Sequence, residues 1–196
     1  MNQMPTDMPR LAPPGAGIPR IERFVGGLLF AWKRWSGTRD RFVAEFTTER
    51  SETARLYESR ADSILQTRVL IPRLRGLEDS SRYWSVYMTL DHLRIVNGQI
   101  KRVITELTNG RIPPGQASTA SVKPRPDVDS EVIAAYESSC DALVATAMSV
   151  PDLNTRLNYE HPWFGPLNAI GWLAMAATHM GIHRAQIVRI LSAISS

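Results

Sequence analysis

The sequence contains only one cysteine, Cys140, so an intramolecular disulfide is excluded. The residues around Cys140 repeat at helical spacing, which predicts a small core residue and not a reactive thiol. Residues 1–20 hold five prolines and lack an apolar core, so we expect neither a signal peptide nor a membrane anchor there. A reducing, cytoplasmic compartment is the resulting expectation.

Strand-like alternation, internal repeats and compact basic runs are also missing from the sequence. The formal net charge is +4, but the Lys and Arg residues are scattered, so specific nucleic-acid binding is not indicated. A hydrophobic content of 43% and a charged content of 21% are those of an ordinary globular protein. The length of 196 residues suits one domain.

Helical periodicity accounts for most of the chain and predicts an all-α four-helix bundle with an additional N-terminal helix. We expect a disordered or loosely draped tail over residues 1–20 and a single helical-bundle domain over 21–196. A Pro- and Gly-rich stretch over 109–127 is expected to be a long loop at the rim of a site. The predicted helices cover about 20–36, 39–46, 49–71, Ser80 or Ser81 to Thr108, 130–150 and 165–194.

The N-terminal helix is rich in apolar and aromatic side chains, including Phe24, Leu28, Trp32 and Trp35. Such a helix could lie on a membrane surface, but packing on the bundle or on a second subunit is the simpler interpretation. We therefore expect a homodimer and no membrane partner.

The last helix is apolar around its whole circumference before Arg184, which predicts a position in the middle of the bundle with Trp172 and Ile187 buried. It carries His179 and His183, which lie one turn apart on the same face. Two imidazoles buried in an apolar helix need partners for their nitrogens, and one metal ion can serve both. A pair of hydrogen-bonded core histidines is the plainer alternative.

The chain has four histidines, so a third metal ligand would be His92 or His161. His92 borders the apolar stripe of its helix and is the better candidate. His161 precedes a proline in a predicted loop and is expected to make loop hydrogen bonds instead. Gln186 and Thr89 are the nearest polar side chains to the three histidines by helical position.

The order of these residues resembles the DinB-like superfamily. The segment HPWFGPLNAIGWLAMAATHMGIHRAQI is similar to a branch with an HPxFG-type turn before the last helix, and WSVYMTLDHLRIVN is similar to the helix of the first histidine. The resemblance implies a four-helix bundle in which His92, His179 and His183 bind a divalent metal, Zn or Ni foremost and Fe as an alternative. It also implies a supporting role for Gln186 and the use of a low-molecular-weight thiol.

This chain departs from that branch at Gly171, where an acidic residue is common, and no acid lies on the face of His179 and His183. An acid would have to come from elsewhere, such as Asp91, Glu106 or Glu160. The expected function is a metal-dependent thiol transferase or hydrolase that acts on a small molecule. The alternatives are a stress-related protein that binds a metal or small ligand without turnover, and a purely structural site.

Overall fold

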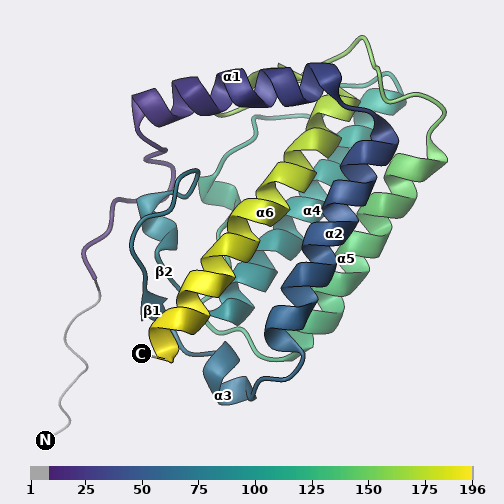
Figure 1. The fold of residues 1–196 in the computed structure, drawn as a ribbon. Helices are drawn as coiled ribbons and strands as arrows, with labels where there is room; N and C mark the ends of the chain where they lie inside the picture. The colour runs from purple at the N-terminus through teal and green to yellow at the C-terminus, as the bar shows by residue number, and fades with distance from the viewer. Residues whose placement is uncertain (1–8, 196) are drawn as a thin grey trace, which may run out of the picture.

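The computed structural model describes residues 9–195, and their fold is a bundle of four long helices that lie side by side (Figure 1). A fifth helix, α1 (Arg20–Ser36), crosses one end of the bundle. The predicted all-α four-helix bundle with an additional N-terminal helix is therefore confirmed. The bundle helices are α2 (Arg39–Tyr57), α4 (Val86–Thr108), α5 (Glu131–Ser149) and α6 (Ala169–Ile194).

The four helices form two parallel pairs that run in opposite directions. Arg39 at the start of α2 donates to the carbonyl of Pro151 just beyond the end of α5 (3.0 Å), so these two helices are antiparallel. Asn97 in the middle of α4 donates to Ser139 in the middle of α5 (3.2 Å). The connection from 109 to 130 brings the chain back along the bundle, so α5 runs parallel to α4 (Figure 1).

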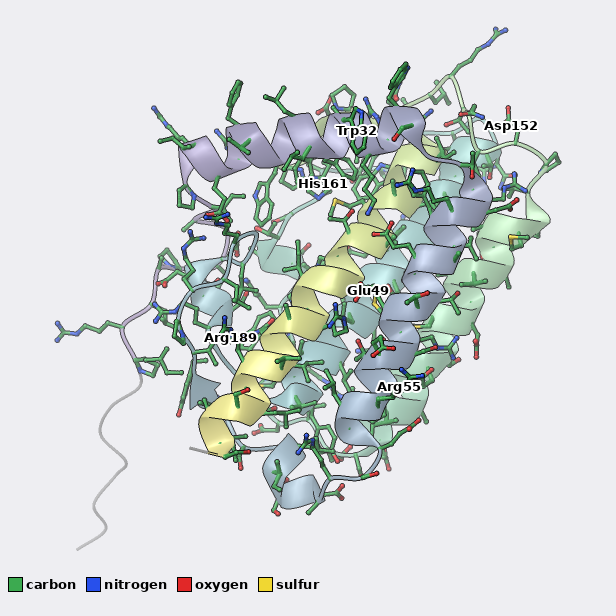
Figure 2. All side chains as sticks on the ribbon, viewed as in Figure 1. Trp32, Glu49, Arg55, Asp152, His161 and Arg189 are labelled. Atoms are coloured by element: carbon green, nitrogen blue, oxygen red, sulfur yellow. The ribbon has the colours of Figure 1, made fainter. Side chains whose placement is uncertain are left out.

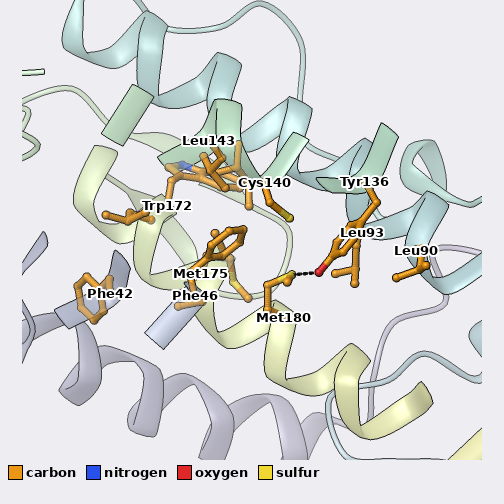
Figure 3. Packing of buried hydrophobic residues seen from close by; sticks show 14 of the residues in the cluster. Phe42, Phe46, Leu90, Leu93, Tyr136, Cys140, Leu143, Trp172, Met175 and Met180 are labelled. Atoms are coloured by element: carbon orange, nitrogen blue, oxygen red, sulfur yellow. Dashed lines mark hydrogen bonds between the residues drawn. The ribbon is translucent and has the colours of Figure 1, made fainter. Parts of the chain in front are cut away.

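The core lies around α6, as its apolar circumference predicts. Every residue from 171 to 177 is buried, and Trp172 and Ile187 are 5% and 0% exposed. Met180 faces Tyr136 of α5, whose hydroxyl donates to the Met180 sulfur at 3.8 Å (Figure 3). Cys140 is fully buried beside them, and burial raises the pKa of its thiol to about 12. Its predicted role as a small core residue is confirmed.

The start of α6 differs from the prediction, because the helix begins at Ala169 and not at 165. Residues Gly165–Leu167 form strand β4, which pairs antiparallel with β3 (Tyr159–His161). The side chain of Asn168 then accepts a hydrogen bond from the Gly171 N–H (3.1 Å) and caps the helix. The residues before the cap have extended backbone, which helical periodicity alone does not exclude.

The predicted helix over 49–71 is wrong, as is its separation from the piece at 39–46. Helix α2 is continuous to Tyr57, and the chain then turns into the short helix α3 (Asp62–Leu65). Strand β1 (Val69–Leu70) follows and pairs with β2 (Tyr83–Trp84). The turn lets Leu65 and Ile71, 1% and 0% exposed, fill the end of the core. An uninterrupted helix would carry these residues away from the core and leave this end unfilled.

The predicted cap of the next helix at Ser80 or Ser81 is also wrong. These residues lie in a 3₁₀ turn, η1 (Asp79–Ser81), and Ser85 caps α4 by accepting from the Met88 N–H (3.1 Å). The predicted end of α4 at Thr108 is confirmed, with Gly110 in the left-handed region at φ 72°. The strands in residues 9–195 have two or three residues each, too few to produce a recognisable alternation.

The predicted tail over 1–20 is described from residue 9 onward, and residues 1–8 lie outside the described part. The Ala12 N–H donates to Asp79 (2.7 Å) and the Gly17 N–H to Glu78 (3.3 Å), so this segment lies along the η1 region. Among residues 9–195, no helix combines the length and the continuous apolarity that a bilayer crossing demands.

Helix α1 contacts the bundle with one face and leaves the other open. Phe30 is its buried residue and stacks near Phe164 with ring centroids 4.8 Å apart. Lys33 binds Glu45 and Thr178. Large apolar side chains on the open side are between 58% and 85% exposed, namely Phe24, Leu28, Trp32 and Trp35. The exposed side chains of Ile21, Val25 and Leu29 instead border a cavity between α1 and the bundle. A contiguous apolar strip of this size is typical of a surface that binds a partner.

We expect this strip to form the interface of a homodimer. Replacing Trp32 and Trp35 by Ser should shift sedimentation from dimer to monomer, because both side chains are exposed and neither fills the core. Replacing Met148 by Ser is the matched control, since Met148 is 51% exposed on α5. A wild-type protein that sediments as a monomer would contradict the expectation.

Candidate metal centre

The bundle brings three of the four histidines together in its interior. His179 and His183 lie on successive turns of α6, and His92 faces them from α4. The Nε2 atom of His179 lies 3.1 Å from Nε2 of His92 and 3.0 Å from Nε2 of His183. Within residues 9–195, these three side chains are the one group of His, Cys, Asp or Glu placed closely enough to hold a metal ion.

The orientation of His92 is fixed by the long loop that follows α4. The loop contains a 3₁₀ turn, η2 (Ala120–Val122), and the carbonyl of Val122 lies 2.6 Å from Nδ1 of His92. Because a carbonyl can only accept, Nδ1 must carry the proton. Neutral His92 therefore presents a bare Nε2 lone pair to the other two rings.

A two-step hydrogen-bond chain fixes His183 in the same way. The Gln186 amide donates from Nε2 to the carbonyl of Ser81 (2.7 Å), which orients its oxygen toward His183. That oxygen accepts from Nδ1 of His183 (2.7 Å), so the proton is on Nδ1 and the Nε2 lone pair is bare. Gln186 thus supports the site as the resemblance implied, and Ser81 is the partner that sequence reasoning missed.

The two bare lone pairs converge on the same nitrogen of the third ring. A proton on Nε2 of His179 could satisfy His92 or His183, but one N–H cannot make a good hydrogen bond to both. A cation among the three nitrogens satisfies all of them. The observed separations are close to the roughly 3.3 Å expected between nitrogens that share one tetrahedral zinc ion, so the donor set fits a metal.

Burial keeps all three rings neutral, which is the form that binds metals. It lowers the pKa of His92 to about 4, and the charge of Lys123 acts in the same direction. The pKa values of His179 and His183 lie well below the ordinary 6.5, mainly because burial disfavours the cation and because a neighbouring imidazole opposes it further. Neutral imidazole is therefore the resting form near pH 7.

The three histidines open into a cavity of about 980 Å³ between α1, α4, α6 and the 109–127 loop. Its wall is mainly apolar, with Val96, Ile100, Phe164 and Met175 among the lining side chains. Residues 116–119 and 121–123 of the loop lie on this wall, where the sequence predicted the rim of a site. Sequence reasoning did not anticipate the lining by α1, which lies outside any recognised motif.

Two carboxylates on the cavity wall were also missed, Glu22 and Glu78. Glu22 pairs with Arg73 (2.5 Å) and accepts from the Gly76 N–H, and its pKa is lowered by these bonds despite partial burial. Glu78 pairs with Lys123 (2.8 Å), which also lowers the pKa of this carboxyl against the effect of burial. Both acids are ionised and already engaged with cations.

The acids named from the sequence lie away from the histidines. Asp91 is buried and accepts from Arg94 (2.8 Å), Glu106 pairs with Arg111, and Glu160 is exposed on β3. Gly171 has a steric explanation, because a Cβ there would lie 3.1 Å from the Arg34 side chain and 3.2 Å from Leu167. A larger side chain at this position would require the Arg34 side chain to shift.

The fold is thus a four-helix bundle in which imidazoles from facing helices line one interior cavity, the arrangement of bundles with an internal ligand site. Its sequence matches the family model of the DinB superfamily over residues 45–187, and the chain belongs to that superfamily. The resemblance drawn from the histidine order and the HPWFG turn is thereby confirmed.

A solved structure is similar to this fold. It is described as the crystal structure of TT2238, a four-helix bundle protein. The TM-score is 0.55 at 22% identity, and the match covers 76% of this chain and 96% of that chain. At this identity the likeness supports the fold alone. No curated protein matches the sequence.

The support from Gln186 can be tested by removing its amide. Gln186→Leu should weaken metal binding about tenfold to a hundredfold, because His183 loses the acceptor that holds its ring. Thr89→Val is the control, since the Thr89 hydroxyl donates to the Ser85 carbonyl (2.9 Å) and not to a histidine. Of the two nearest polar side chains by helical position, Gln186 therefore contacts a histidine ring and Thr89 binds the backbone of its own helix. Competition with a chromophoric chelator gives both affinities, and equal binding by Gln186→Leu and wild type would refute the role of the amide.

The lowered histidine pKa values predict how stability depends on pH. Between pH 7 and pH 5 the unfolded chain binds more protons than the folded chain, so the free energy of unfolding should fall as the pH falls. For His92, with a folded pKa of about 4, the loss over this range is about 2 kcal/mol. Urea unfolding of chelator-treated protein at both pH values should show this loss, and His92→Phe should reduce it. An identical pH dependence in the two proteins would contradict the assignment.

Proposed function

We propose that this protein binds one divalent metal ion through His92, His179 and His183, and that the ion activates a small molecule in the adjoining cavity. The observation that carries the proposal is the meeting of two fixed, bare nitrogens at a third imidazole in the interior. Hydrogen bonds among the rings leave one lone pair unsatisfied, which is costly in a buried site. Zn and Ni suit three neutral imidazoles, and Fe is a further candidate.

Transfer to or from a low-molecular-weight thiol is the reaction that the lining residues favour. When bound, a metal of this kind lowers the pKa of a coordinated thiol and supplies a nucleophile at neutral pH. Hydrolysis requires a base to take a proton from water, and the carboxylates of the wall, Glu22 and Glu78, are ion-paired with Arg73 and Lys123. A coordinated thiol needs such a base less, because a free thiol has a pKa of about 8.5 and water has one of about 15.7. We therefore place a thiol transferase ahead of a hydrolase.

The apolar wall suits the second substrate or a bound small ligand. A cavity of about 980 Å³ lined by Phe164, Trp172 and Met175 would accept an apolar electrophile beside the metal. The same wall supports the alternative of ligand binding without turnover, because no unengaged carboxylate faces the histidines from the described residues. The two candidates share the metal site and differ in whether a product forms.

The metal site is tested by metal content after dialysis against a weak chelator. His183→Ala should weaken binding by orders of magnitude, because it removes one of the three nitrogens. His161→Ala should do far less, because His161 stands outside the three-histidine group. Equal retention by His183→Ala and wild type would defeat the assignment. Loss on His161→Ala alone would mean that another set of ligands holds the ion.

A further inference from the structure

His161 is the fourth imidazole on the cavity wall, and it stands outside the three-histidine group. It lies at the end of β3, beneath α1 in Figure 2, with its ring stacked on Phe164 at 4.9 Å and 5.4 Å from Trp172. Trp172 precedes His179 by two turns on the same face of α6. The β3–β4 hairpin thus holds the His161 ring along the face of α6 that carries the metal ligands.

The hairpin turn fixes both the position and the tautomer of His161. Gly165 has φ 69°, the left-handed conformation that closes a three-residue turn between paired strands. The Trp163 N–H donates to Nδ1 of His161 (3.2 Å), so Nδ1 carries the lone pair. The neutral ring therefore bears its proton on Nε2. This is the opposite arrangement to His92 and His183, whose protons are on Nδ1.

The Nε2–H group of His161 has no hydrogen-bond partner among residues 9–195, although its ring is half-buried. The cations nearest to the site are engaged elsewhere. Lys123 binds Glu78, and Lys33 binds Glu45 and Thr178. His161 is thus a preset neutral donor on a wall where Lys33, Arg73 and Lys123 are already paired with carboxylates.

We propose that His161 binds the anionic atom of the molecule held at the metal, by donating from Nε2 to a thiolate sulfur or an oxyanion. The inference rests on the proposed function and assigns a ligand-binding role to a residue of the HPWFG turn. His92 and His183 present bare Nε2 atoms, which suit a cation. His161 presents an N–H group at Nε2, which suits an anion. A fixed donor loses little entropy on binding, so the bond contributes fully to affinity.

The experiment uses the protein loaded with Co²⁺ and titrated with 2-mercaptoethanol, whose thiolate produces a charge-transfer absorption band on binding. His161→Phe keeps an aromatic ring against Phe164 but removes the donor, and should weaken thiolate binding about tenfold to a hundredfold. The apparent pKa for thiol binding should rise in this variant. His161→Gln restores an amide donor and should recover part of the affinity.

Glu160→Gln is the matched control, because it changes an exposed side chain of the same strand, β3, and leaves the His161 donor and the cavity wall in place. It should bind the thiolate within about threefold of wild type. Equal thiolate affinity in His161→Phe and wild type, with equal cobalt content, would overturn the inference while leaving the metal site intact. Cobalt loss in His161→Phe would overturn it by making His161 a ligand. Failure of wild type to bind cobalt would instead refute the proposed function.

Discussion

The structure depends on how three imidazole rings are accommodated in an apolar interior. Each ring brings two nitrogens into the interior, and each nitrogen needs a partner. The protein supplies partners for Nδ1 of His92 and His183 from a loop carbonyl and from the Gln186 amide. Doing so forces both Nε2 atoms to be lone pairs aimed at His179. A cation at the centre would satisfy all three Nε2 atoms, and burial keeps the rings in the neutral form that can bind one.

The parallel arrangement of α4 and α5 has a direct consequence for this site. Joining two parallel helices requires a connection as long as the bundle, which is why residues 109–130 form an extended crossover. That crossover passes beside α4 and places the Val122 carbonyl on His92 and Lys123 near Trp84 (5.4 Å). The loop rich in Pro and Gly is thus a structural wall of the cavity. Its Thr119 and Lys123 side chains donate to Glu78 of the cavity wall, and Lys123 is the cation paired with this carboxylate.

Much of the fold and the identity of the three histidines could be predicted because both rest on helical periodicity. The i, i+4 pair at His179 and His183 and the apolar stripe beside His92 place these side chains in the interior whatever the exact helix ends are. The errors fall where periodicity carries no information. The short ladders β1–β2 and β3–β4 are too brief to alternate, and the false helix over 49–71 continues through a turn set by core filling. The partners Val122 and Ser81 are distant in sequence and are set by tertiary contact alone.

Helix α1 gives this cavity a feature that the family match does not cover, since the match begins at residue 45. Phe30 rests near Phe164 of the hairpin turn, and Lys33 reaches Thr178, the neighbour of His179 in sequence. Gly171 leaves the room that the Arg34 side chain occupies, so the residue that departs from the branch is coupled to the presence of α1. Helix α1 thereby covers the cavity with apolar side chains, among them Val25, Leu29 and Phe30.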